Sequence, residues 1–167
     1  MRVYASHPLL LLLVIVLVAL GGCTSQSPLD ELAAKSPDPS LAPEEVVRIQ
    51  VDAFRNNDGA DRGIEIAFRF ASPANKRLTG PLPRFAQMMR NGLYEPMLLA
   101  EEVAISDVQV RGNLARVVVS LETPDGRNHD YVFFLTKQGQ GEYAGSWMTE
   151  GVSLLDEPGG PGNGAVI

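Results

Sequence analysis

Cysteine and histidine are scarce in this 167-residue sequence, which contains one cysteine and two histidines. A single cysteine, Cys23, can form no internal disulfide, so the folded part of the chain must be stabilised by its core alone. His129 is the only histidine after residue 22, and no carboxylates cluster at the spacing of metal ligands. We therefore expect neither a metal site nor a bound cofactor.

Basic residues are also few. The sequence has 14 lysines and arginines against 20 aspartates and glutamates, which gives a formal net charge of −6. An acidic chain without a basic stripe repels phosphate backbones, so nucleic acid is excluded as a partner. The sequence lacks the phosphate-binding motif G-x-x-x-x-G-K-[ST], the nucleophile motif G-x-S-x-G and the zinc motif H-E-x-x-H. Composition and motifs thus assign no enzymatic chemistry.

No apolar run is long enough for a transmembrane helix. The longest, residues 9–20, has 12 residues, whereas a span needs about 20. Arg2 before this run and two glycines after it are typical of an export signal. The string Leu20-Gly21-Gly22-Cys23 resembles the bacterial lipobox, in which the cysteine receives lipid before cleavage. The resemblance implies that Cys23 anchors the mature protein to a membrane; the alternative is an ordinary signal peptide followed by an incidental cysteine.

The chain is expected to divide into four parts. Residues 1–22 form a lipoprotein signal peptide, and residues 23–42 form the lipidated cysteine and a flexible tether, because three prolines disfavour a helix there. Residues 43–155 form one domain, and the glycine- and proline-rich residues 156–167 form a disordered tail. The expected location is extracytoplasmic and membrane-anchored.

The residue after the anchor refines this location. Thr24 is not the aspartate that retains many lipoproteins in the inner membrane. The lipoprotein resemblance then implies the periplasmic face of the outer membrane in a cell with two membranes. In a cell with one membrane it implies the outer leaflet of that membrane.

Within residues 43–155, helical periodicity comes first and strand periodicity second. Pro43 and the following glutamates favour a helix start, residues 60–71 favour a second helix, and a third begins at Pro81. Strands are predicted over residues 94–99, 103–110, 114–123, 129–137 and 147–155. This order predicts an α+β fold, with three N-terminal helices packed on a curved antiparallel sheet of four to five strands.

The order of elements resembles the nuclear-transport-factor-2-like, or cystatin-like, α+β cone. The closing strand with Gly145-Ser146-Trp147 resembles the same superfamily. The strings Gly-Ile-Glu-Ile-Ala-Phe-Arg-Phe-Ala-Ser-Pro at residues 63–73 and Thr-Gly-Pro-Leu at residues 79–82, with Asn75-Lys76 and Arg84-Phe85, are similar to an uncharacterised domain of that type. That domain occurs in bacteria and photosynthetic eukaryotes. The resemblance implies a fold alone, since the superfamily includes isomerases, cyclases, dehydratases and binding modules. No catalytic motif is matched.

A hairpin between residues 114 and 137 provides candidate site residues. If residues 124–127 form the turn, Glu122 lies opposite His129 and Ser120 lies opposite Tyr131. One face then packs Val132 and Phe134 on the helices. The other face is half polar and half aromatic, and its candidate residues are Arg116, Ser120, Glu122, His129 and Tyr131.

Three explanations of that mixed face remain open. It is a solvated surface, a homodimer interface with a polar rim, or the lining of a cavity in which His129 or Glu122 transfers a proton. A second candidate is the loop over residues 72–80, where Asn75, Lys76 and Arg77 gather before a helix start that would suit an anion. The simpler alternative is that these residues only end one helix and begin the next.

Two functions from different classes remain. The preferred one is a lipid-anchored, non-catalytic domain that binds a small apolar ligand or an envelope protein near the membrane. The alternative is an isomerase-, cyclase- or dehydratase-like enzyme acting on a small hydrophobic molecule, with Glu122, His129 or Tyr131 in its pocket. A structural subunit that dimerises through its sheet is a third possibility.

Overall fold

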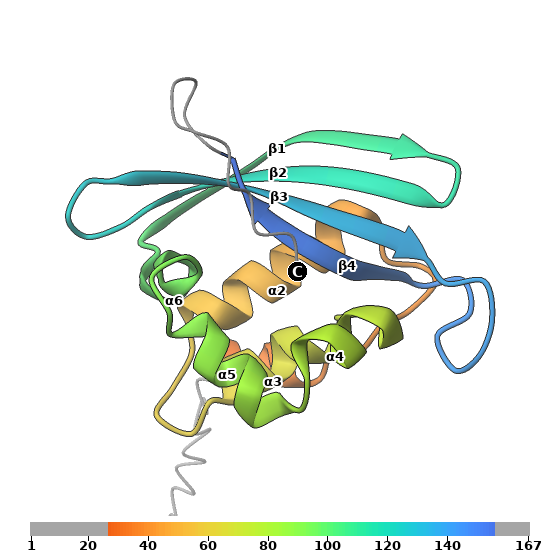
Figure 1. The fold of residues 1–167 in the computed structure, drawn as a ribbon, viewed down its shortest axis with the longest axis horizontal. Helices are drawn as coiled ribbons and strands as arrows, with labels where there is room; N and C mark the ends of the chain where they lie inside the picture. The colour runs from red at the N-terminus through yellow and green to blue at the C-terminus, as the bar shows by residue number, and fades with distance from the viewer. Residues whose placement is uncertain (1–26, 156–167) are drawn as a thin grey trace, which may run out of the picture.

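The computed structural model describes residues 27–155, which form an α+β fold (Figure 1). Four strands form one antiparallel sheet in which each strand pairs with the next along the chain, and helices cover one side of it. The α+β class and the four-stranded antiparallel sheet are therefore confirmed. In chain order the elements are α1 (Pro28–Ala33), α2 (Pro43–Arg55), α3 (Arg62–Arg69), α4 (Pro73–Thr79), α5 (Leu82–Met89), α6 (Glu95–Leu99), β1 (Glu102–Arg111), β2 (Leu114–Glu122), β3 (Asn128–Lys137) and β4 (Trp147–Leu154).

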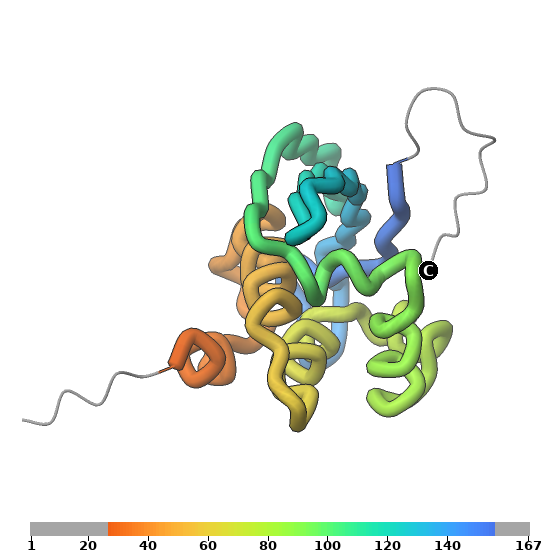
Figure 2. Tube along the Cα trace, turned by 90° about the vertical axis from the view of Figure 1, so that its left-hand side faces the viewer, coloured from red at the N-terminus to blue at the C-terminus, as the bar shows by residue number. Residues whose placement is uncertain are grey.

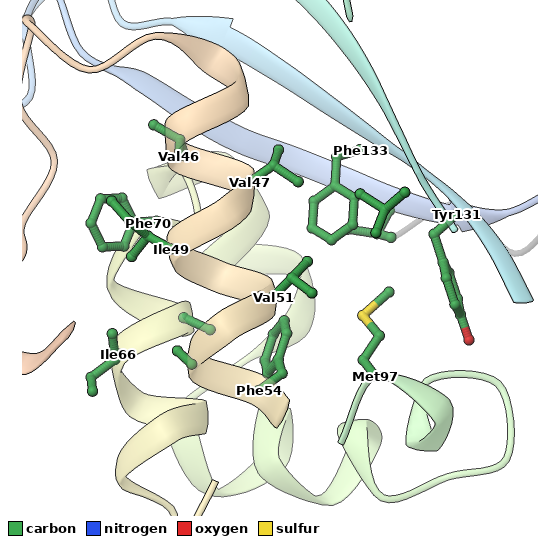
Figure 3. Packing of buried hydrophobic residues seen from close by; sticks show 14 of the residues in the cluster. Val46, Val47, Ile49, Val51, Phe54, Ile66, Phe70, Met97, Tyr131 and Phe133 are labelled. Carbon is green, nitrogen blue, oxygen red and sulfur yellow. The ribbon is translucent and has the colours of Figure 1, made fainter. Parts of the chain in front are cut away.

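Helix α2 is the central element of the helical layer. Pro43 is at its first turn, and the Glu45 carboxylate accepts a hydrogen bond from the Ala42 N–H at 2.7 Å, which satisfies an otherwise free donor. Figure 3 shows Val47 and Val51 of α2 pointing toward Phe133 of β3. All three side chains are buried, so this contact joins the helices to the sheet.

Two segments beside the sheet differ from the sequence prediction. Residues 94–99, predicted as a strand, contain the helix α6. Its N-cap Tyr94 and its residue Met97 are buried three residues apart, which is a helical spacing. Residues 72–80, predicted as a loop, contain α4, whose N-cap Ser72 accepts a hydrogen bond from the Asn75 N–H at 3.0 Å. The described chain thus has six helices rather than three.

Residues 24–42 were predicted to be coil, but residues 28–33 within them form the helix α1. Ser27 and Asp30 form a capping box around its first turn, and Leu29 is buried against the core. Arg69 of α3 donates hydrogen bonds to the carbonyls of Ala33 and Lys35 at 2.8 and 2.7 Å. Helix α1 is therefore docked on the helical layer instead of belonging to a free tether.

The β2–β3 hairpin closes with a shorter turn than predicted. The Thr123 N–H donates to the Arg127 carbonyl at 3.0 Å, and Gly126 has φ +76°, the left-handed conformation used by three-residue hairpin loops. His129 therefore lies opposite Leu121, and Tyr131 lies opposite Val119. The predicted register, which paired these two residues with Glu122 and Ser120, is wrong by one position.

This shift moves every β3 side chain to the opposite face of the sheet, because side chains alternate along a strand. Tyr131, Phe133 and Leu135 are buried against the helices. Val132 and Phe134, which were predicted to pack there, lie on the other side. The candidate residues of the hairpin therefore do not share one face of the sheet.

Candidate functional site

The side of the sheet turned away from the helices is here called the outer face. It comprises the even-numbered residues of β2 and β3 and the residues paired with them on β1 and β4. Leu114 and Phe134 are the largest apolar side chains exposed on it, at 61% and 39% of their surface. Exposed apolar side chains that lie together on one face are a feature of interaction surfaces.

An open groove of about 410 Å³ lies over these two residues. Apolar side chains, Leu114 and Phe134 among them, provide much of its lining, and the charged residues Arg111, Arg116 and Glu150 also line it. Enclosed pockets bury most of a small ligand, whereas an open groove on a sheet leaves much of it in water. The shape therefore suits an apolar segment of a larger partner better than a small substrate.

The carboxylate of Glu150 at one edge of the groove is already engaged. Its Oε2 accepts a hydrogen bond from the Ser72 hydroxyl at 2.8 Å, and its Oε1 accepts one from the Thr136 hydroxyl. The Glu150 backbone carbonyl accepts from the Asn75 amide at 2.8 Å. These bonds fasten the start of α4 to β3 and β4, so Glu150 is a structural group rather than a free general base.

A β-bulge marks the β1 side of the groove. The register of β1 against β2 shifts between Ser106 and Gln109, and Asp107 adopts φ 46°. The carboxylate of Asp107 accepts hydrogen bonds from Gln109, at 3.0 Å, and from Arg116. These two bonds, the Gln109 bond first, lower the pKa of Asp107 below its usual value. The bulge thereby holds Arg116 against β1 and interrupts the free edge of the sheet.

The opposite end of the outer face is acidic. Glu102 and Glu122 are directly paired across β1 and β2, and Asp130 stands on the neighbouring strand beside Ser120. Like charges in directly opposed positions destabilise a sheet. None of these three carboxylates has a salt bridge within residues 27–155. This end of the face therefore favours an approaching cation.

The five candidate residues of the hairpin are divided between the two faces. Arg116, Ser120 and Glu122 lie on the outer face, whereas His129 and Tyr131 lie on the helix side. Tyr131 is fully buried and its hydroxyl donates to the Leu93 carbonyl at 2.8 Å. Burial, and to a smaller degree the neighbouring Tyr94, raise the pKa of Tyr131 far above the usual value for tyrosine. The structure does not bring Glu122 together with His129 or Tyr131 in one pocket.

His129 lines a separate pocket of about 400 Å³ between α6 and the hairpin loop. Its Nε2 atom is buried and has no hydrogen-bond partner among the described residues. A buried polar atom without a partner costs stability instead of adding to it. The Nε2 atom of His129 is thus not paired with a catalytic base among the described residues.

Two substitutions are expected to separate the structural roles of these residues. Tyr131→Phe should lower the free energy of unfolding by about 1 kcal/mol, because the partly buried Leu93 carbonyl loses its donor. His129→Leu should cost nothing or add stability, since it removes an unpaired polar atom. Urea unfolding followed by the fluorescence of the single tryptophan, Trp147, measures both. A larger loss for His129→Leu than for Tyr131→Phe would contradict this assignment.

The three residues of the predicted anion loop do not converge on one site. The Asn75 amide binds the Glu150 carbonyl, and Arg77 is exposed. The Lys76 ammonium donates to the Arg69 carbonyl at 3.1 Å and lies 5.5 Å from the ring centres of Phe68 and Tyr143. Burial lowers the pKa of Lys76, partly opposed by Glu142. Lys76 thus joins α3 and α4 to the β3–β4 loop, and the anion site remains a prediction.

Sequence reasoning missed the apolar residues of the outer face. Phe134 was assigned to the helix side because the hairpin turn was taken as one residue too long. Glu150 was missed because its partners Ser72 and Thr136 come from distant parts of the chain. Cys23 lies outside the described residues. The described residues contain no helix long and apolar enough to cross a membrane and no group of three or more potential metal ligands.

Comparison with known protein families finds one match. Residues 39–161, which include every element from α2 to β4, match the family described as Domain of unknown function (DUF4864). The chain belongs to this family. The uncharacterised domain expected from the sequence is thereby identified as DUF4864, and the outer face and its groove lie within it. No curated protein and no solved structure matches the chain significantly.

Proposed function

We propose that this protein is a lipid-anchored, extracytoplasmic binding protein whose DUF4864 domain uses the outer face of its sheet to bind an apolar partner surface. The observation that carries the proposal is the open groove over Leu114 and Phe134. Apolar surface of this kind, rimmed by charged groups, is typical of interaction sites. The lipid anchor is proposed from the lipobox resemblance at Cys23.

We also propose that the fold is of the nuclear-transport-factor-2-like type. The support is the order of the elements: helices precede an antiparallel meander and cover one face of it. The same order leaves the opposite face of the sheet without helices. A fold of this type would therefore present a broad strand surface to a partner.

The distribution of titratable groups favours binding over catalysis. General acid–base chemistry needs an acid and a base that reach the same substrate atoms. Glu122 and Tyr131 lie on opposite sides of the sheet, and Tyr131 donates to a backbone carbonyl. The enzyme alternative of the sequence analysis rested on these residues sharing a pocket.

The proposed anchor would orient the domain at the membrane. Three residues lie between Cys23 and Ser27, so the four residue steps from one to the other span at most about 14 Å. Helix α1 begins at Pro28 and is fixed to the helical layer by Arg69. The helical layer would then lie close to the membrane, which leaves the outer face available to a partner.

The binding property is tested with an uncharged apolar fluorescent probe, Nile red, on the full-length protein at a detergent concentration too low for micelles to take up the probe. Phe134→Glu should weaken probe binding about tenfold, because the ring supplies a contact of roughly 1.5 kcal/mol. Leu78→Glu is the matched control, since Leu78 is 69% exposed on α4 and away from the face. Equal probe binding by wild type and Phe134→Glu would overturn the proposal.

A further inference from the structure

We propose that the partner of the outer face is an extended segment of another protein, in which apolar side chains are followed, on the same side of the segment, by lysine or arginine. The inference rests on the proposed function, because it names the chemistry of the partner that the same face binds. It is carried by charge complementarity. The apolar groove and the acidic end lie on one face of the sheet and share the strands β2 and β3.

The acidic end costs the fold stability and returns nothing to it. Glu102 and Glu122 are directly paired, and Asp130 lies on the next strand. All three are exposed, and none forms a salt bridge within residues 27–155. Like charges in directly opposed positions destabilise a sheet. A cation of the partner would remove this repulsion, which gives the arrangement a role in binding.

The acidic end is also hollowed. A depression of about 150 Å³ lies there, and Glu102 and Glu122 are among its lining residues. Ala104 and Ser120, which are directly paired, line it as well, and their small side chains leave room between the two carboxylates. Carboxylates bind ammonium and guanidinium groups through charge-assisted hydrogen bonds. The depression therefore suits the end of a lysine or arginine side chain.

The strand register sets the spacing that the partner needs. Phe134 in the groove and Asp130 at the acidic end are four residues apart on β3, or about 13 Å. Asn128, which is paired with Glu122, is six residues from Phe134, or about 20 Å. Side chains on one side of an extended segment recur at every second residue. The partner thus places its basic residues about four and six positions from an apolar one.

The arginines of the outer face set the direction of the segment. Arg111 is directly paired with Leu114 beside the β1–β2 turn, and Arg116 is held by Asp107. Leu114 is eight residues from Glu122 along β2, or about 27 Å. A basic side chain of the partner is repelled at the arginine end and attracted at the acidic end. Complementary charge of this kind fixes the orientation of a bound segment.

The net charge and the position of α1 both favour access by such a partner. The formal net charge of −6 attracts a basic segment from a distance. Figure 2 shows α1, the red-orange helix, beside the helical layer and away from the sheet. The end of the chain that leads to the proposed lipid therefore does not cover the outer face.

The test uses two fluorescently labelled peptides of identical composition. In Leu-Ser-Leu-Ser-Lys-Ser-Lys the leucines and lysines share one side of an extended chain, whereas in Leu-Ser-Leu-Lys-Ser-Lys-Ser the lysines are on the opposite side. Fluorescence anisotropy with the full-length protein in a non-ionic detergent measures both affinities. The first peptide should bind about fivefold more tightly, the effect of two partly exposed charge pairs. Nonspecific attraction by the acidic protein is the same for both peptides.

Charge removal identifies the end of the face that is responsible. Glu102→Gln combined with Glu122→Gln should abolish the preference for the first peptide and leave Nile red binding unchanged. The same double variant should unfold at a higher urea concentration than wild type, because the opposed carboxylates are gone. Weaker peptide binding by a more stable protein excludes unfolding as the cause. Glu31→Gln combined with Glu65→Gln, on exposed positions of α1 and α3, is the control and should keep the preference.

The outcomes separate this inference from the proposed function. Equal affinity of wild type for the two peptides, or a preference that survives in the Glu102 and Glu122 double variant, overturns the basic segment as partner. If Nile red binding still depends on Phe134 in that case, the proposed function stands without it. Nile red binding that does not depend on Phe134 overturns the proposed function instead.

Discussion

Gly63→Ala is expected to destabilise the domain by about 3 kcal/mol, because α3 crosses α2 at this glycine with no room for a side chain. A Cβ atom at residue 63 would lie 2.1 Å from the Ala53 carbonyl oxygen and 2.8 Å from the Asn57 Cα, both backbone atoms. Moving α3 away would also disturb the hydrogen bond from the Ile64 N–H to the Asn57 side chain, at 3.0 Å. Helix propensity alone predicts the opposite sign, a gain of about 1 kcal/mol.

Urea unfolding followed by Trp147 fluorescence gives the free energy of unfolding for this comparison. Gly59→Ala is the matched control, because nothing lies within 4 Å of a Cβ atom at that position. The control should change stability by less than about 0.5 kcal/mol. If Gly63→Ala were as stable as wild type, the close packing of α2 and α3 described above would be incorrect.

Cys23→Ser is expected to abolish lipid labelling of the protein. The lipobox resemblance requires the Cys23 thiol, and a serine hydroxyl does not replace it. Cells grown with labelled palmitate should therefore incorporate label into wild type and none above background into the variant. The unprocessed variant should also retain the 22 residues before the cysteine, which raises its mass on a denaturing gel.

Ser25→Ala is the control for this experiment, since it changes a neighbouring residue without touching the thiol. It should keep both the label and the processing of wild type. An unlabelled wild type that is cleaved normally, with Cys23→Ser cleaved in the same way, would support an ordinary signal peptide and remove the anchor from the account. The binding face of the domain would be unaffected by that result.

The helices that the sequence analysis missed share one physical feature. α1, α4 and α6 each have a proline in the first turn, at Pro28, Pro73 and Pro96. A proline disrupts the interior of a helix but suits its first turn, where the missing N–H would have no partner in any case. Pro43 was interpreted in this way and α2 was predicted correctly. Pro28 and Pro73 were interpreted as helix breaks, although Ser27 and Ser72 stood directly before them as N-caps. Pro96 was placed within a predicted strand.

The candidate site depended on a single residue of register. The alternation of buried side chains along β2 was predictable from the sequence, and Val117, Val119 and Leu121 are buried as expected. The pairing of β3 depended on the left-handed Gly126, which closes the loop in three residues instead of four. The sequence Pro-Asp-Gly allowed both lengths, so local chemistry did not decide which β3 residues face outward.

Other parts of the site require tertiary structure. Ser72 and Glu150 are 78 residues apart and meet only because α4 packs beside β4. The carboxylates of the acidic end and Arg111 share one face of the sheet only because the four strands pair in this register. Arg116 and Glu122, in contrast, were identified from β2 alone, because they share a face at every register of that strand.

The central claim, that the outer face is where this protein binds its partner, is tested most directly by photo-crosslinking in intact cells. A photoreactive phenylalanine analogue replaces Phe134, and the same analogue at Leu78 is the control. The account predicts a crosslinked product from position 134 and none from position 78. No product from position 134, or an equal yield from position 78, would contradict the account itself.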